Sequence, residues 1–242
     1  MSFSNSKQLA VLLPGFGCDN DSMLELGNGL DNTKSVSHTK YEVFSSEPSL
    51  DKMAGKVVKQ YPDSELLLIG FSMGGWVAQE VASRLGSQLK GLVLISSWTE
   101  APSQYLEIVQ SLYEEIKSGK KLASLKPLVA EGFVNTETRD HMTNRWLSMA
   151  NRVGPEVFLR QTKAILDHPN VTNCIANIES PLLAIAGAED ALLNPNDQFK
   201  GVKKHKSLQT MVLDSCGHNL IWERPQAVCS IIKQWLHLSF EH

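Results

Sequence analysis

A serine, an aspartate and a histidine each follow an apolar run of the sequence, and these side chains together could catalyse acyl transfer. Ser72 lies in Gly70-Phe71-Ser72-Met73-Gly74, a G-x-S-x-G pattern typical of a nucleophilic serine on a sharp strand-to-helix turn. A histidine can take the proton of a serine hydroxyl as it attacks a carbonyl, and an aspartate can orient that histidine. The sequence therefore predicts a triad of Ser72, Asp190 and His218.

A second glycine-rich turn could stabilise the negative charge that forms during such an attack. Pro14-Gly15-Phe16-Gly17 directly follows an apolar run that ends at Leu13. Backbone amides in a turn of this kind can face a ligand. We expect the N–H groups of Phe16 and Met73 to form an oxyanion hole, in which each donor contributes about 3 kcal/mol in comparable enzymes.

Other residues could fill the same roles. The rival carboxylates are Glu189, Asp197 and Asp214. Asp190 is favoured because it comes three residues after the glycine that ends a buried strand, at the sheet edge where ligands of α/β folds bind. We expect Asp214 to shape the turn before His218. The remaining histidines occur in polar or terminal stretches and are expected at the surface: His38, His141, His168, His205, His237 and His242.

The elements that must position these residues alternate between strand and helix. Short apolar runs at 9–13, 66–69, 92–95 and 182–186 predict buried strands, 208–213 predicts the last strand, and 40–44 predicts an outer strand. Amphipathic patterns predict helices at 23–30, at 49–61 with Ser49 as the N-cap, and at 226–236. This alternation indicates an α/β fold with a mostly parallel sheet and helices on both faces.

The segment from about residue 101 to 170 differs from the rest. Its periodicity is helical throughout, without a strong strand signal. A helical insertion between consecutive strands is expected to form a lid over the active face of a single domain spanning residues 1–242. Its basic residues nearly balance its acidic ones, which is ordinarily the pattern of a solvated surface.

Composition narrows the class of protein. The 242 residues include 42% hydrophobic and 20% charged residues, typical of one globular domain. A net charge of −3 offers no general attraction for nucleic acid. No apolar run approaches a membrane span, and the first seven residues lack the apolar segment of a secretory signal. We therefore expect a cytoplasmic protein, a monomer, with neither nucleic acid nor membrane as a partner.

The four cysteines, Cys18, Cys174, Cys216 and Cys229, have neither C-x-x-C spacing nor a paired framework. Zinc and disulfides are therefore not implied, and no metal or cofactor is expected. Cys18 and Cys216 lie close in sequence to the predicted site. With Ser72 present, a catalytic cysteine is not expected.

The chain resembles the α/β-hydrolase superfamily over nearly its whole length, since its triad has that superfamily's chain order. More narrowly, Val11 to Gly17, Ser49 to Ala54 and Gly70 to Gly75 are similar to the pimeloyl-carrier-protein methyl ester esterases of biotin synthesis. The resemblance implies an α/β-hydrolase fold with a helical lid, and cleavage of the methyl ester of pimeloyl-acyl carrier protein. It also implies carrier-protein contacts for lid arginines, here Arg139, Arg145, Arg152 or Arg160.

The sequence departs from the superfamily in two places. Pro14 stands where a histidine usually precedes the oxyanion residue, which leaves the backbone amides available. The region 32–47 is short and lacks the usual glycine-rich turn, so one strand or its loop is trimmed. These differences affect the expected substrate more than the chemistry.

Three functions remain open. The first is a carboxylic ester hydrolase acting on a small acyl ester, with the carrier-linked pimeloyl methyl ester as the specific expectation. The second keeps the triad but is a broad-specificity small-ester hydrolase or thioesterase without a biotin role. The third is a non-catalytic ligand-binding protein on a hydrolase fold. The complete set of Ser72, Asp190, His218 and the oxyanion turn disfavours the third, whereas nothing in the sequence separates the first two.

Overall fold

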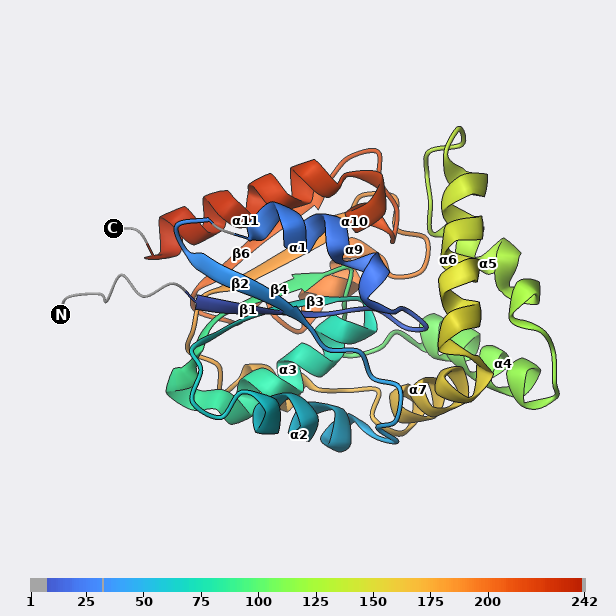
Figure 1. Ribbon diagram of the computed structural model, residues 1–242, viewed down its shortest axis with the longest axis horizontal. Helices are drawn as coiled ribbons and strands as arrows, with labels where there is room; N and C mark the ends of the chain where they lie inside the picture. Colours follow the sequence, from blue (N-terminus) through green and yellow to red (C-terminus); the bar gives the residue numbers. More distant parts are fainter. Residues whose placement is uncertain (1–7, 32, 241–242) are drawn as a thin grey trace.

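A computed structural model describes residues 8–31 and 33–240, and six parallel strands form the central sheet of this part (Figure 1). The strand order is β2-β1-β3-β4-β5-β6. The strands are β1 (Gln8–Leu13), β2 (Val36–Tyr41), β3 (Leu66–Phe71), β4 (Leu89–Ile95), β5 (Leu182–Gly187) and β6 (Leu208–Leu213). The predicted parallel α/β sheet is confirmed, whereas the expectations for the first seven residues and for His242 fall outside the described residues.

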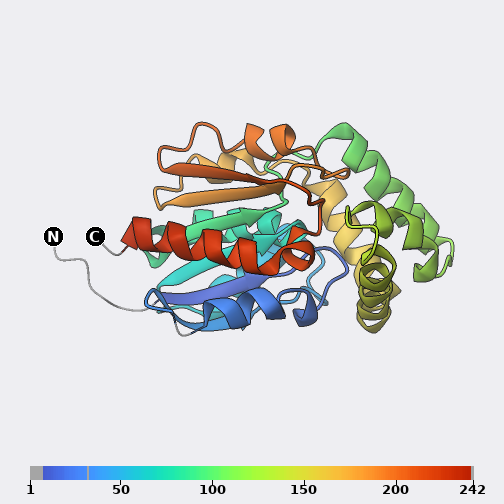
Figure 2. The same cartoon turned by 90° about the horizontal axis from the view of Figure 1, so that it is seen from above.

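Helices cover both faces of this sheet. Successive side chains of a strand point to opposite faces, so Ala10 and Leu12 join one apolar cluster while Val11 and Leu13 join another. Helices α1 (Leu24–Leu30) and α11 (Pro225–Phe240) cover the first face, and α2 (Leu50–Gln60) and α3 (Met73–Leu85) cover the second (Figures 1 and 2). Burial on both faces explains why β1 and β3 are uninterrupted apolar runs.

The outer strand was placed wrongly from the sequence. We expected it at 40–44, but β2 runs from Val36 to Tyr41 and pairs with β1. Only Val36 of this edge strand is buried, so β2 carries little apolar signal. Phe44 is buried beyond the end of the strand, and its hydrophobicity shifted the prediction.

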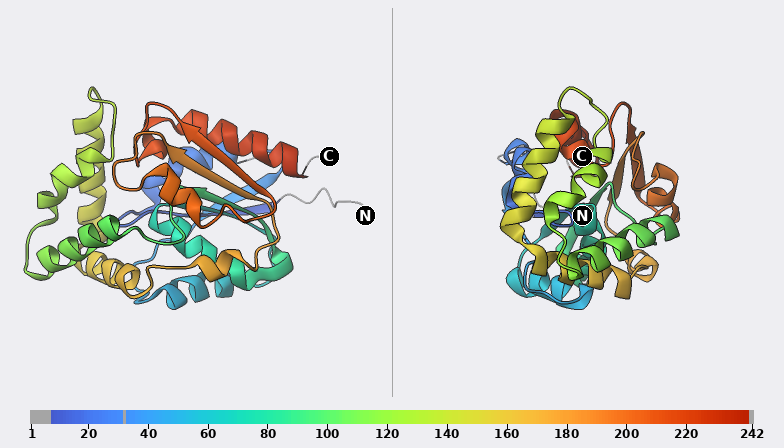
Figure 3. Two further views of the ribbon diagram at one scale, coloured as in Figure 1. Left: turned by 180° about the vertical axis from the view of Figure 1, so that it is seen from behind. Right: turned by 90° about the vertical axis from the view of Figure 1, so that its right-hand side faces the viewer.

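The helical insertion lies at the carboxyl ends of the strands (Figures 1 and 3). It contains α4 (Ser103–Lys117), η3 (Leu122–Leu125), α5 (Lys126–Glu131), α6 (Arg139–Val153), α7 (Pro155–Asp167) and α8 (Thr172–Ile175). An isolated antiparallel bridge between Glu100 and Asn170 joins its two ends, near the predicted limits. The remaining helices are η1 (Asn20–Ser22), η2 (Gly86–Gln88), α9 (Pro195–Lys200) and α10 (Leu220–Glu223). Within residues 8–31 and 33–240, none of the helices is both long and apolar enough to span a bilayer.

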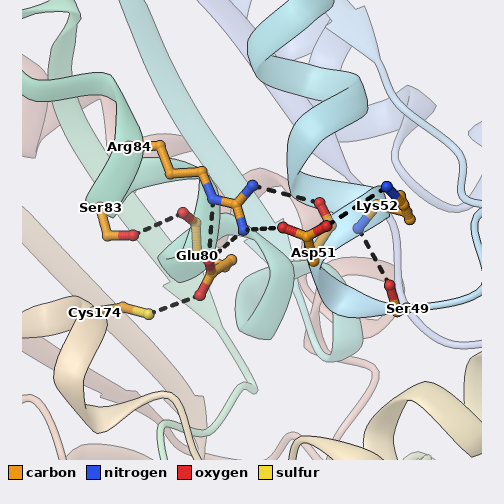
Figure 4. A network of polar contacts seen from close by, with 7 residues as sticks. All are labelled: Ser49, Asp51, Lys52, Glu80, Ser83, Arg84 and Cys174. Atoms are coloured by element: carbon orange, nitrogen blue, oxygen red, sulfur yellow. Dashed lines mark hydrogen bonds and ion pairs between the residues drawn. The ribbon is translucent and has the colours of Figure 1, made fainter.

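A polar network fixes α3, the helix that follows Ser72, to its neighbours (Figure 4). Arg84 of α3 donates to Asp51 of α2 at 3.1 Å and to Glu80 at 3.0 Å. The Cys174 thiol of α8 donates to Glu80 at 3.0 Å. These contacts join three helices on one face of the sheet and hold the second half of α3 against α2 and α8.

Candidate active site

Ser72 occupies a strained turn between β3 and α3. Its φ of 52° and ψ of −119° are unusual for a residue other than glycine, and such strain persists only where neighbouring contacts enforce it. The Ser72 N–H donates to Ile95 O at 2.8 Å, and the Ser97 hydroxyl donates to Ser72 O at 2.8 Å. These bonds hold the turn, so that the Ser72 side chain stands at the carboxyl edge of the sheet.

Two glycines of the G-x-S-x-G pattern allow strand and helix to approach closely. A Cβ atom at Gly70 would lie 2.4 Å from Gly75 Cα. A Cβ atom at Gly74 would lie 1.9 Å from Leu13 O at the end of β1. Both distances are shorter than van der Waals contact, so the first turn of α3 can pack here only without these side chains.

Gly74→Ala is expected to abolish the native fold or to leave a protein with a displaced nucleophile turn, because the colliding atom belongs to backbone that cannot rotate away. The measurement is soluble yield, together with thermal unfolding of any soluble fraction. Gly55→Ala in α2 is the matched control, since the nearest atom to its Cβ would be 4.0 Å away. The control should be as stable as the wild type or more stable by up to about 1 kcal/mol. Equal behaviour of the two variants would contradict this account of the turn.

The structure brings the three predicted triad residues together. His218 Nε2 lies 2.9 Å from Ser72 Oγ, and His218 Nδ1 lies 2.9 Å from Asp190 Oδ2. All three residues are buried. Asp190 follows β5 and His218 follows β6, so the side chains come from the ends of three parallel strands. This is the arrangement that the strand-end positions predicted.

Asp190 is held as a hydrogen-bond acceptor. Its Oδ1 accepts from the N–H groups of Leu192 at 3.0 Å and Leu193 at 2.9 Å, and its Oδ2 accepts from Gln198 Nε2 at 2.9 Å. An ionised carboxylate only accepts, so we assign the proton between Asp190 and His218 to Nδ1. His218 Nε2 is then an acceptor for the Ser72 hydroxyl. Gln198 was not predicted, because it lies in a polar stretch without a distinguishing pattern.

The two predicted oxyanion donors lie after β1 and β3. Strand β2 lies on one side of β1 in the sheet, and β3, which follows β2 along the chain, lies on the other side. Ligands of α/β folds bind at the carboxyl ends of two strands where the strand order reverses in this way, which here are β1 and β3. Among the hydrogen bonds of the described residues, none has the Phe16 or the Met73 N–H as its donor. Both amides therefore remain available to a ligand.

Gln161 of α7 supports the oxyanion turn. It is 1% exposed, accepts from the Gly17 N–H at 2.8 Å and donates to Phe44 O at 2.7 Å. This role of Gln161 was not predicted from the sequence. A signal was present, because Gln161 falls on the apolar stripe of α7 that includes Val157 and Phe158, and a buried polar side chain on such a stripe needs a partner.

Gln161→Leu should lower both stability and activity. The substitution leaves the Gly17 N–H and Phe44 O without partners, which destabilises the fold by about 1–3 kcal/mol for each unpaired group. A displaced oxyanion turn should lower kcat/KM for an ester about 10- to 100-fold. The checks are urea unfolding and ester hydrolysis, with the exposed Gln110→Leu of α4 as the control. Wild-type activity in Gln161→Leu would contradict the supporting role.

A small apolar cavity opens onto Ser72 and His218, with a volume of about 90 Å³. Helices of the insertion form much of its wall. Within the described chain, no aspartate, glutamate, lysine or arginine lines this cavity. Its lining consists of Phe16, Cys18, Phe71, Ser72, Tyr105, Ile108, Val109, Leu112, Leu125, Leu128, Val129, Trp146, Thr162, Leu192, His218 and Asn219.

The two thiols near the site are poor nucleophiles. Burial, opposed by hydrogen bonds and reinforced by the charge of Asp19, raises the pKa of Cys18 to about 12. Burial, followed by the charge of Glu223, raises the pKa of Cys216 to about 11. Both thiols are therefore protonated at neutral pH, when only a thiolate reacts readily. All four cysteines are free.

The four arginines proposed for carrier-protein contacts already bind groups of this chain. Arg139 donates to the carbonyls of Phe133 and Val134, and Arg160 donates to the Ser45 carbonyl. Arg145 donates to Glu25 and lies over the Trp222 ring. Arg152 donates to Asp19 and Asp21. Arg139 and Arg160 thus brace backbone, whereas Arg145 and Arg152 tie α6 to the segment after the oxyanion turn. Across residues 8–31 and 33–240 there is no cluster of three or more histidine, cysteine or acidic side chains suited to a metal ion.

The sequence model of the alpha/beta hydrolase fold family matches residues 13–225, and the chain belongs to this family. It is 21% identical over 254 residues to the "Biotin biosynthesis bifunctional protein BioHC" of Cellvibrio japonicus, covering 95% of this chain and 48% of that protein. It is 25% identical over 180 residues to a 2-hydroxy-6-oxononadienedioate/2-hydroxy-6-oxononatrienedioate hydrolase of Burkholderia vietnamiensis, covering 70% of this chain and 61% of that protein. The chain thus spans about half to three fifths of the length of these relatives.

Solved structures share the fold. An esterase from Thermogutta terrifontis superposes with a TM-score of 0.81 at 19% identity, covering 98% of this chain and 92% of that one. The enol-lactonase from Burkholderia xenovorans LB400 superposes with a TM-score of 0.82 at 14% identity, covering 96% and 92%. Structural similarity at identities this low shows that the fold is shared. The reaction has to be inferred from the residues of the site.

Proposed function

We propose that the protein is a carboxylic ester hydrolase with Ser72 as nucleophile, His218 as general base and Asp190 as the group that orients the histidine. The observation that carries this proposal is the continuous hydrogen-bonded chain from Ser72 Oγ through both ring nitrogens of His218 to Asp190. Ser72, at one end of this series of hydrogen bonds, lines an apolar cavity that could hold an acyl chain. The backbone N–H groups of Phe16 and Met73, next to this cavity, donate no hydrogen bond within the described residues. A site that only bound ligands would not need this proton path.

Each step of ester cleavage has a group in place. Ser72 Oγ attacks the carbonyl carbon while His218 Nε2 takes its proton, and the Phe16 and Met73 amides bind the resulting oxyanion. The carbon–oxygen bond to the alcohol then breaks, and His218 returns the proton to the leaving alkoxide. His218 then takes a proton from a water molecule, which attacks the acyl carbon. The bond from this carbon to Ser72 Oγ breaks, His218 returns the proton to Oγ, and the carboxylic acid is released.

The cavity favours short or medium acyl groups without charge. A volume of about 90 Å³ corresponds to roughly six to nine water-sized groups. A carboxylate placed there would be desolvated without a cationic partner, which is strongly unfavourable. The same argument disfavours the dioate substrates in the name of the Burkholderia vietnamiensis relative.

The test compares acyl groups of equal length that differ in charge. The p-nitrophenyl esters of hexanoic acid, of adipic acid as the free monoacid, and of monomethyl adipate are hydrolysed at pH 7.5. The hexanoyl and methyl adipoyl esters should exceed the free adipoyl ester by about 100-fold or more in kcat/KM, because one unpaired buried charge is that unfavourable. Equal rates would contradict the proposed specificity, and inactivity on every ester would contradict the hydrolase.

We further propose a role in biotin synthesis, in which the substrate is the methyl ester of pimeloyl-acyl carrier protein. It is supported by the likeness to a biotin biosynthesis protein and by the uncharged cavity, which accepts a methyl ester end and disfavours the acid produced. Growth without biotin of a strain lacking its own methyl ester esterase is the test, with Ser72→Ala as control. Failure of a soluble, esterase-active protein to restore growth would indicate the broad-specificity esterase or thioesterase instead.

Carrier-protein binding by the insertion, which we propose acts as a lid, has a separate test. Arg152 is 52% exposed at its side chain but is paired with Asp19 and Asp21, so Arg152→Gln removes its charge without placing a new acid beside them. If Arg152 contacts the carrier, kcat/KM should fall for carrier-linked substrate and stay unchanged for a small methyl ester. Equal loss on both substrates would instead indicate a folding defect.

A further inference from the structure

The wall of the cavity contains a tyrosine whose hydroxyl is unpaired. Tyr105 of α4 is 8% exposed and lies beside Ile108, Val109 and Leu112 on the cavity side of the helix. Its ring packs on Trp98, with centroids 4.8 Å apart. Among residues 8–31 and 33–240, no group forms a hydrogen bond with the Tyr105 hydroxyl. A hydroxyl that lacks a protein partner on a largely buried side chain is free to bond a ligand or a water molecule that enters the cavity.

The other side-chain donors on the cavity wall are already satisfied. Cys18 donates to Phe16 O at 3.4 Å, Thr162 to Phe158 O at 2.8 Å, Asn219 to Gly132 O at 3.4 Å and Ser72 to His218 at 2.9 Å, while the Trp146 indole interacts with the Cys18 thiol and lowers its pKa. In the described part of the chain, Tyr105 is therefore the side-chain donor of this wall that remains free for a substrate.

We propose that the Tyr105 hydroxyl donates a hydrogen bond to an uncharged oxygen within the acyl chain of the substrate, and so selects esters that carry such an acceptor. This inference rests on the proposed ester hydrolase. Tyr105 belongs to the same apolar wall that would hold the acyl chain. A purely hydrocarbon acyl chain would leave the Tyr105 hydroxyl without a hydrogen-bond partner, whereas an ether, keto or ester oxygen in the chain would accept its hydrogen bond.

The surroundings of Tyr105 define the kind of acceptor. Burial raises the pKa of Tyr105 well above its ordinary value, and the negative charge of Asp190 raises it further. The phenol therefore stays protonated at neutral pH and acts as a donor. The same negative charge repels an anionic acceptor, so a neutral oxygen suits this position better than a carboxylate.

The test uses a series of ester substrates whose acyl chains have the same length and differ in the position of one ether oxygen. Wild type, Tyr105→Phe and Tyr113→Phe are assayed with p-nitrophenyl hexanoate and with its 3-oxa, 4-oxa and 5-oxa analogues. Tyr113 lies on the same helix, outside the cavity, and its ring contacts Lys117. The ratio of kcat/KM between wild type and variant is compared for each ester, since intrinsic reactivity cancels in this ratio.

For Tyr105→Phe, the wild-type to variant ratio should be about five to ten at one oxygen position and within twofold for hexanoate, as expected for one lost hydrogen bond. Tyr113→Phe should give a flat ratio near one. A flat ratio for Tyr105→Phe, with hexanoate turnover retained, would overturn the inference and leave the esterase proposal standing. Turnover of hexanoate by Tyr105→Phe also reports folding. If the wild type hydrolyses none of the esters, both proposals are overturned.

Discussion

Ser72→Ala is expected to lower kcat/KM for p-nitrophenyl hexanoate by about 10⁵-fold or more, the loss seen when the nucleophile of such a triad is removed. The Ser72 hydroxyl bonds His218 at 2.9 Å, and among the described residues no other hydrogen bond of the turn depends on this oxygen atom. The variant should therefore fold as the wild type does. Thermal unfolding and ester hydrolysis measured on the same preparation separate the two effects.

Ser83→Ala is the matched control for this substitution. Ser83 lies on α3, the helix that follows Ser72, and its hydroxyl donates to Glu80 O at 2.8 Å, away from the cavity. Activity of the control should stay within about twofold of wild type. If Ser72→Ala retained more than about one hundredth of the wild-type rate, another group would have to supply the nucleophile.

Asp190→Asn should produce the second large loss, about 10⁴-fold in kcat with little change in KM. The asparagine amide can donate to His218 Nδ1, which places the ring proton on Nε2. That nitrogen then cannot accept the proton of Ser72. The N–H groups of Leu192 and Leu193 still donate to the remaining side-chain oxygen and hold the side chain in place, although the new NH2 group can no longer accept from Gln198.

The rival carboxylate provides the control for Asp190. Asp214 is exposed after β6, and Asp214→Asn should leave kcat within about twofold of the wild type. A comparable loss in Asp214→Asn, or wild-type activity in Asp190→Asn, would show that the acid has been assigned to the wrong residue. Steady-state kinetics with both variants at pH 7.5 distinguishes these results.

The sequence was sufficient to predict the sheet and the three side chains at its edge. Strands buried on both faces are continuous apolar runs, and three of these runs end close to a glycine: Gly15, Gly70 and Gly187. Since parallel strands end at one edge, the positions of Ser72, Asp190 and His218 after three such strands imply that the side chains converge. The atomic reason for the glycines, such as the 1.9 Å approach at Gly74, required the structure.

Contacts between elements distant in sequence could not be predicted in the same way. Gln161 reaches the predicted oxyanion turn across 144 residues. Arg152 pairs with Asp19 and Asp21 because α6 packs beside that segment, a relation that local patterns do not encode. The edge strand β2 was misplaced for a related reason, since its exposed side chains carry no apolar periodicity.

Covalent labelling with a fluorophosphonate tests the central claim most directly. Attack by an activated serine on phosphorus displaces fluoride and leaves a stable phosphonyl adduct on the serine oxygen. The account predicts one adduct per chain, assigned to Ser72 by tandem mass spectrometry and absent from both Ser72→Ala and His218→Ala. An adduct on another residue, or a wild-type protein that remains unlabelled although it is folded, would contradict it.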